Sequence, residues 1–177
     1  MGTFEKIMKN FTIFTFLGAI LCGVLFKIYH IDLLFTLTVT FSVTCYHISI
    51  RLLIGAIIDR LFHNKMDYHH KWFREKSFEP ALYKKLKVKQ WKNKMPTYSP
   101  ASFSIKEHSL TEIIGASCQA EIVHEVIVIF CFLPVLLSFA IDSFPVFLIT
   151  SVLSALVDMP FVIIQRYNRP RIVKMIK

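Results

Sequence analysis

The chain has 177 residues, enough for one domain, and 54% of them are hydrophobic. Lys and Arg outnumber Asp and Glu by 21 to 12, which gives a net charge of +9. The charges gather between long apolar runs, a pattern that excludes an ordinary soluble domain and is typical of a membrane protein. The sequence contains no nucleic-acid-binding motif, so we attribute its basic character to membrane topology and anionic headgroups, and we expect no nucleic-acid partner.

Four apolar runs are predicted to cross the membrane as helices, at residues 11–28, 33–58, 122–140 and 144–164. Each is close to the ~20 residues that a helix needs to span the hydrocarbon. Short loops join the first run to the second and, around Asp142, the third to the fourth, so each pair should form a helical hairpin. The predicted fold class is therefore all-α, an integral membrane bundle that forms a single domain over residues 1–177.

A long polar segment, 59–119, separates the two hairpins and combines many lysines with aromatic residues. Trp72 and Trp91 in it favour amphipathic helices at the membrane interface, although a plain positively charged anchor is the alternative. With four spans, the basic N-terminus, this segment and the basic tail 165–177 share one side of the bilayer. The positive-inside rule makes that side the cytoplasm. We therefore predict a multi-pass protein of the cell membrane whose N-terminus, middle segment and C-terminus are cytoplasmic.

Ionisable residues within the apolar runs are functional candidates, because charges are costly in hydrocarbon. His47 and Arg51 share one face of the second run, Glu121 and His124 share one face at the start of the third, and Asp158 lies in the fourth. At ~1.5 Å of helix rise per residue, all five are expected at one depth, as a polar layer that opens toward the cytoplasm. The alternatives are that Arg51 only snorkels to the headgroups, or that it pairs with Asp158 to hold the bundle together.

Among these residues, His124 is the candidate general base, since histidine is the side chain best suited to that role near neutral pH. Glu121, three residues earlier, is expected to hold the imidazole or to balance its charge. The sequence contains no nucleophile elbow and no Gly-rich phosphate loop, so no covalent serine intermediate is expected. The histidines of the middle segment match no metal-binding spacing, and we expect no metal site.

The string QRYNRPR follows the fourth run and is the most specific local feature of the chain. Pro170 is expected to interrupt a helix there. Arg166, Arg169 and Arg171, together with Asn168, would then present planar donors below the bilayer, where arginine suits phosphate or carboxylate. The alternative is ordinary positive charge that flanks the last span.

Several motifs together resemble the glycosyl-4,4'-diaponeurosporenoate acyltransferases, which esterify a glycosylated carotenoid. The resemblance rests on Ala120-Glu121-x-x-His124, on Pro160, on the QRYNRPR string and on the basic element VKQWK at 88–92. It covers roughly Trp72 to the C-terminus, while the first two runs resemble the family only loosely. The chain departs from the family at Gln119, where the family tends to have a basic residue. The resemblance implies acyl transfer at a membrane.

Our leading hypothesis is an O-acyltransferase that moves a fatty acyl group to a hydroxyl of a membrane lipid or glycolipid, such as a carotenoid glycoside. The co-substrate would be acyl-CoA or an acyl-carrier thioester, with no other cofactor, and Arg51 or Asn168 would stabilise the oxyanion. The catalytic candidates are His124, Glu121, Arg51 and Asp158. The candidates for substrate binding are His47, Lys89, Trp91, Lys92, Arg166, Asn168, Arg169 and Arg171.

Two other functions remain open from the sequence. The chain could be a non-catalytic membrane subunit of a lipid-synthesis complex, in which the buried charges form a structural network. It could also be a small transporter, in which the same charges line a path for a substrate or protons. The sequence leaves the oligomeric state open.

Overall fold

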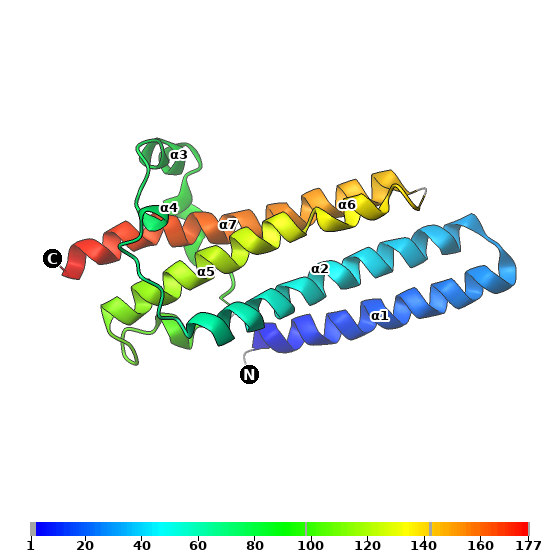
Figure 1. The fold of residues 1–177 in the computed structure, drawn as a ribbon, viewed down its shortest axis with the longest axis horizontal. Helices are drawn as coiled ribbons and strands as arrows, with labels where there is room; N and C mark the ends of the chain where they lie inside the picture. The colour runs from blue at the N-terminus through cyan, green and yellow to red at the C-terminus, as the bar shows by residue number, and fades with distance from the viewer. Residues whose placement is uncertain (1–2, 98, 142, 177) are drawn as a thin grey trace. The chain divides into compact units, whose positions relative to one another are not determined.

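The computed structural model describes residues 3–97, 99–141 and 143–176, and each regular element in these ranges is a helix (Figure 1). This confirms the all-α fold class. The predicted turn residue Asp142 and the last tail residue, Lys177, lie outside the described residues. The long helices are α1 (Thr3–Tyr29), α2 (Asp32–Phe62), α5 (Leu110–Phe130) and α7 (Phe144–Ile176). The short elements are α3 (Glu79–Lys85), α4 (Val88–Trp91), α6 (Leu133–Leu137) and the 3-10 turns Lys71–Phe73, Lys92–Lys94 and Ala101–Phe103.

Four helical stretches are long and apolar enough to cross a membrane: Phe4–Tyr29, Asp32–Phe62, Leu110–Leu137 and Phe144–Ile176. Their number agrees with the prediction from the sequence. Large apolar side chains along α1 are mostly exposed, for example Phe14 at 58%, Leu17 at 58% and Leu21 at 60%. An apolar surface of this kind suits lipid rather than water. The chain is therefore a membrane protein.

The third long helix begins at Leu110, about three turns before the predicted span, which starts at Ile122. Ser109 and Glu112 form a reciprocal cap at its start. The Glu112 backbone N–H donates to Ser109 Oγ at 3.3 Å, and the Ser109 backbone N–H donates to Glu112 Oε2 at 2.8 Å. This Ser-x-x-Glu pattern is a capping box. Ile113 and Ile114 are buried directly after it, so protein packing extends the helix beyond the apolar run.

The prediction that Pro170 interrupts a helix is wrong, because α7 continues through both Pro160 and Pro170 to Ile176. Proline lacks a backbone N–H, so the carbonyl four residues before it loses its helical partner. The side chains of Arg166 and Arg169, in the turn before Pro170, bind to glutamates of α3 and α5, so this part of α7 is tied to both helices.

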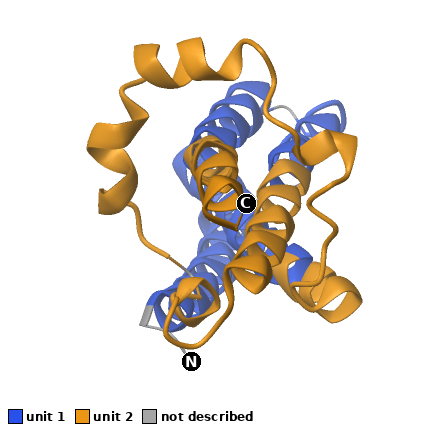
Figure 2. Ribbon diagram, turned by 90° about the vertical axis from the view of Figure 1, so that its left-hand side faces the viewer, with its two compact units in different colours: residues 1–54, 127–157 blue, residues 55–126, 158–177 orange. Residues whose placement is uncertain are grey.

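The described chain divides into two compact units, coloured in Figure 2. Unit 1 comprises Met1–Ile54 and Ile127–Val157, and unit 2 comprises Gly55–Val126 and Asp158–Lys177. Helices α2, α5 and α7 each pass from one unit into the other. Helices α1 and α6 belong to unit 1, whereas α3 and α4 belong to unit 2.

In unit 1, α1 and α2 run side by side as the predicted hairpin (Figure 1). The two helices approach closely at Gly18. A Cβ atom there would lie only 3.1 Å from the ring of Phe41. Val39 and Val43 of α2 pack in turn against Phe147 of α7. Dispersion contacts of this kind drive helix association in lipid, where apolar burial alone gives no advantage.

In unit 2, Gln119 in the first half of α5 is bonded to the end of α2 and to the residue Asn64 that follows it. The Asn64 backbone N–H donates to Gln119 Oε1 at 2.7 Å, and Gln119 Nε2 donates to Asp59 Oδ1 at 3.1 Å. Asn64 has a φ of 59°, in the left-handed region that asparagine tolerates better than most residues. The backbone at Gly115 passes directly beneath the Asn64 carbonyl.

Replacing Gly115 by Ala is expected to destabilise the protein by about 1–3 kcal/mol, since the new Cβ would overlap the backbone carbonyl of Asn64. Thermal unfolding in detergent measures this loss. Gly55→Ala is the matched control in α2, where a Cβ meets nothing within 4 Å. Its expected effect is neutral or stabilising by up to about 1 kcal/mol. Equal losses in both variants would contradict the close approach at Gly115.

Candidate functional site

A histidine–carboxylate pair joins α5 to α7 within unit 2. Nδ1 of His124 lies 2.9 Å from Oδ1 of Asp158. The Asp158 side chain is 2% exposed, whereas the His124 side chain is 23% exposed. Phe161 lies one turn after Asp158 on α7 and stacks on the imidazole, with ring centroids 4.7 Å apart and planes 11° apart. The imidazole is therefore held at one edge and on one face.

This arrangement gives the imidazole a defined polarity. A carboxylate at Nδ1 favours the tautomer whose proton sits on Nδ1, and it leaves a lone pair on Nε2. In the described ranges, Nε2 of His124 has no hydrogen-bond partner. Nε2 is thus the free end of a pair in which the His124 side chain is partly exposed and the Asp158 side chain is buried, which is the geometry of an oriented general base.

The predicted pairing of Glu121 with His124 is wrong. Glu121 is fully buried and instead binds two arginines of α7: Arg166 Nη1 donates to Oε1 at 2.5 Å, and Arg169 Nη2 donates to Oε2. A buried carboxylate needs opposite charges around it, and these guanidinium groups supply them. The spacing along α5 identified two residues of one helix but could not identify which residue of α7 each one meets.

The charge network extends from α5 and α7 to α3. Arg166 Nε donates to Glu79 Oε1 at 2.7 Å, and the Tyr83 hydroxyl donates to Glu79 Oε2 at 3.0 Å. Burial, and then this bond to Glu79, raise the pKa of Tyr83. Arg169 also donates to the Phe73 carbonyl at 3.2 Å. Two glutamates and two arginines thus neutralise one another and tie α3, α5 and the 3-10 turn at 71–73 to α7.

This network changes the interpretation of the QRYNRPR string. Arg169 is only 2% exposed, and its guanidinium is bound to Glu121 and to backbone carbonyls. Arg166 is bound to both glutamates of the network. Two of the three arginines therefore clamp protein carboxylates, and their predicted role in substrate binding finds no support in this geometry. Arg171 differs, because it is exposed.

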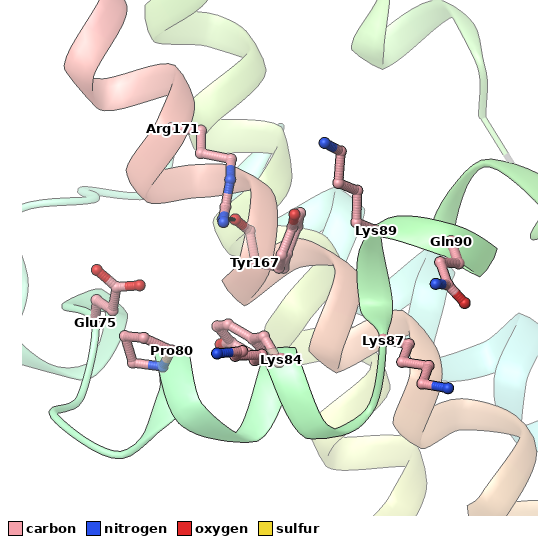
Figure 3. Close-up of a pocket in the computed structure, with 9 residues that line it drawn as sticks. Glu75, Pro80, Lys84, Lys87, Lys89, Gln90, Tyr167 and Arg171 are labelled. Atoms are coloured by element: carbon pink, nitrogen blue, oxygen red, sulfur yellow. Dashed lines mark hydrogen bonds between the residues drawn. The ribbon is translucent and has the colours of Figure 1, made fainter.

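Arg171 lines a pocket of about 370 Å³ between α3, α4 and α7 (Figure 3). Lys84 of α3 and Lys89 of α4 also line it, as does Lys87 between these helices. Tyr167 provides part of the wall, with the Arg171 guanidinium 3.6 Å from the centroid of its ring. The pocket is strongly basic. Of the predicted binding residues, Lys89 and Arg171 are part of it.

Three further predicted binding residues lie beside this pocket. Lys92 Nζ donates to Asn168 Oδ1 at 2.8 Å, and it lies 5.2 Å from the centroid of the Tyr167 ring. Burial, and then the charge of Arg171, lower the pKa of Lys92. Trp91 packs against the buried cluster that contains Tyr167, and its Nε1 donates to the Leu86 carbonyl at 2.9 Å. Trp91 is therefore a packing residue in this structure.

The remaining predicted site residues, His47 and Arg51, belong to unit 1. Arg51 Nη2 donates to the carbonyl and to Oγ of Ser154 on α7, at 2.9 and 2.8 Å, and Nη1 donates to the His47 carbonyl at 2.5 Å. The guanidinium is thus bonded within the helix bundle of unit 1. The predicted common layer of these two residues with Glu121, His124 and Asp158 joins both units and stays a prediction.

Sequence reasoning missed several residues that shape the site. Glu79 was missed because nothing near it in the sequence marks it for burial, and its partner Arg166 follows 87 residues later. Phe161 had a usable signal, since it lies three residues after Asp158 and so on the same helix face. Trp72 was assigned to the membrane interface, yet its Nε1 donates to Glu125 Oε2 at 2.9 Å, next to His124.

The described residues contain no group of three or more His, Cys, Asp or Glu side chains that could hold a metal ion. The expectation that the protein uses neither a metal nor a bound cofactor stays a prediction.

The fold and this site define a helical membrane protein that carries an oriented His–Asp pair and, farther along α7, a basic pocket. The family model of glycosyl-4,4'-diaponeurosporenoate acyltransferase matches residues 69–177, more than half of the chain, and the chain belongs to this family. The match includes the His124–Asp158 pair, the glutamate–arginine network and the basic pocket. Comparison with curated proteins and with solved structures finds no match.

Proposed function

We propose that the protein is a membrane-bound O-acyltransferase, which moves a fatty acyl group from an acyl thioester to a hydroxyl of a lipid or glycolipid. A carotenoid glycoside is the acceptor type that the family description suggests. Membership of this family supports acyl transfer. The observation that carries the mechanism is the pairing of the partly exposed His124 with the buried Asp158.

In the proposed reaction, Nε2 of His124 takes the proton of the acceptor hydroxyl while the hydroxyl oxygen attacks the thioester carbonyl carbon. A C–O bond forms, and the carbonyl oxygen becomes the oxyanion of a tetrahedral intermediate. The intermediate then collapses with cleavage of the C–S bond, and the departing sulfur takes the proton from Nε2. The products are an ester and a free thiol. Asp158 accepts the Nδ1–H bond throughout and stabilises the imidazolium while it exists.

Two residues are candidates for donating a hydrogen bond to the oxyanion, Arg51 and Asn168. Asn168 lies ten residues after Asp158 on the continuous helix α7, which corresponds to roughly 15 Å along the helix axis. That separation argues against direct contact between Asn168 and a carbonyl that reacts at His124. Arg51 stays the predicted donor.

We further propose that unit 2 faces the cytoplasm. Its middle segment and the end of α7 carry most of the lysines and arginines of the chain, and the positive-inside rule supports this orientation. A soluble cytoplasmic donor could then reach the site directly.

Purified protein in lipid nanodiscs provides the test of this function. It would be incubated with a palmitoyl thioester and with lipids extracted from cells that lack the protein. We expect a lipid whose mass increases by one palmitoyl group, with release of one equivalent of thiol. The charge-balanced glutamate–arginine network would also suit a non-catalytic subunit. If the folded protein forms no ester alone, but does so when a partner enzyme is added, that alternative is correct.

A further inference from the structure

The pocket between α3, α4 and α7 carries positive charge that the protein leaves unneutralised. Lys84, Lys87 and Lys89 are exposed, and within the described ranges their ammonium groups have no hydrogen-bond or ion-pair partner. With Arg171, four cations line the pocket against a single carboxylate, that of Glu75. Like charges gathered around one cavity raise the local concentration of anions. This contrasts with the network around Glu121, where every charge has a counter-charge.

The wall of the pocket on α7 is held in place. The Arg171 guanidinium stacks on Tyr167 and also donates to the Tyr167 carbonyl. Tyr167 itself is buried and packs against Tyr83 and Val88. Figure 3 shows Arg171 and Tyr167 projecting from α7 on the side where Lys84 and Lys89 approach. A planar guanidinium fixed in this way suits the oxygens of a phosphate group.

The distance to the His124–Asp158 pair limits what the ligand can be. Arg171 lies thirteen residues after Asp158 on α7, roughly 20 Å along the helix axis. A group bound at Arg171 therefore cannot itself react at His124. It can only anchor a substrate whose reactive end is carried on a long, flexible arm.

We propose that this pocket binds the phosphate groups of the nucleotide part of a coenzyme A thioester, which is the acyl donor. This inference rests on the proposed acyl transfer. The nucleotide carries a pyrophosphate and a phosphate monoester, and these negative charges match the four cations of the pocket. Its linear pantetheine arm, extended along α7, carries the thioester from the pocket toward His124. The pocket thus recognises the donor by charge, separately from the reaction.

Binding of coenzyme A without an acyl group tests this proposal independently of catalysis. The purified full-length protein in nanodiscs of phosphatidylcholine would be titrated by calorimetry at low salt. The variant Lys84→Gln/Lys89→Gln removes two unpartnered cations from the pocket. Its dissociation constant for coenzyme A is expected to rise about 10- to 100-fold, as for lost hydrogen bonds to charged groups.

The matched control is Lys94→Gln/Lys106→Gln, which changes the net charge by the same amount at two exposed lysines outside the pocket. Its dissociation constant should stay within about twofold of that of the wild type. Pantetheine, which lacks phosphate, should not compete with coenzyme A. Equal weakening in both double variants, or no binding of coenzyme A by the wild type, would overturn the proposal.

A phosphate could also come from a lipid headgroup. A second experiment distinguishes the headgroup from coenzyme A. Native mass spectrometry would measure the phosphatidylglycerol retained by the wild type and by Lys84→Gln/Lys89→Gln. Loss of retained lipid in the pocket variant with unchanged binding of coenzyme A would overturn the proposal and assign the pocket to a headgroup. If coenzyme A binds at the pocket but no ester forms, the proposed acyl transfer fails and this site stands. If the ester forms with an unchanged KM for the donor in the pocket variant, this site fails alone.

Discussion

Replacing His124 by Gln is expected to lower kcat for acyl transfer by about 10²- to 10⁴-fold, the usual contribution of a general base. The Gln amide is polar and close to imidazole in size, but it cannot accept the proton of the acceptor hydroxyl. Initial rates in nanodiscs at saturating donor and acceptor measure the effect. KM should change little, because His124 acts on the proton rather than on the long apolar or phosphate parts of the substrates.

His108→Gln is the control for this substitution. His108 lies before α5, its side chain is 40% exposed, and its nearest charged neighbour is Glu112 at 3.9 Å. Its kcat should equal that of the wild type. A folded His124→Gln protein with more than about a tenth of wild-type activity would contradict a base with the usual contribution.

Replacing Glu121 by Gln is expected to destabilise the protein by about 3–5 kcal/mol, the effect of removing one partner from a buried ion pair. Glu121 is the carboxylate that binds Arg169, so the substitution leaves that buried guanidinium without a counter-charge. Arg166 retains Glu79 and should be affected less. Unfolding by heat or denaturant in detergent, followed by circular dichroism, measures the loss.

The double variant Glu121→Gln/Arg169→Gln should recover part of this stability, because it removes the unpaired charge as well. Glu107→Gln is the surface control, at an exposed position before α5 that forms no ion pair within the described ranges. If Glu121→Gln proved as stable as Glu107→Gln, the network would not hold unit 2 together.

The four membrane helices could be predicted because hydropathy and length are local properties of the sequence. Their ends were harder to predict, for two different reasons. The capping box at Ser109 and Glu112 was present in the sequence, but the apolar run begins only later. Pro170 misled the prediction because proline lowers local helix propensity, whereas the arginines before it bind residues far away in the chain, which local propensity does not reveal.

The sequence selected the residues of the His124–Asp158 pair, but it did not predict that these two residues bind each other. Depth in the membrane selected both His124 and Asp158, and the structure joins them. Their pairing depends on how α5 and α7 are rotated about their axes, which spacing along one helix cannot determine. For the same reason, Glu121 was assigned to His124 rather than to Arg166 and Arg169. The pocket lysines were obscured because a basic segment beside a membrane span is expected for topology alone.

The most direct test of the account is a double-mutant cycle of His124→Gln and Asp158→Asn on kcat. If Asp158 acts by orienting His124 and stabilising its imidazolium, Asp158→Asn should lower kcat in the wild-type background. It should not lower kcat any further in the His124→Gln background, because that variant lacks the base on which Asp158 acts. The two single variants and the double variant must first be shown to be folded. If the two substitutions instead reduce kcat independently, so that their factors multiply in the double variant, the His124–Asp158 pair is not the catalytic unit.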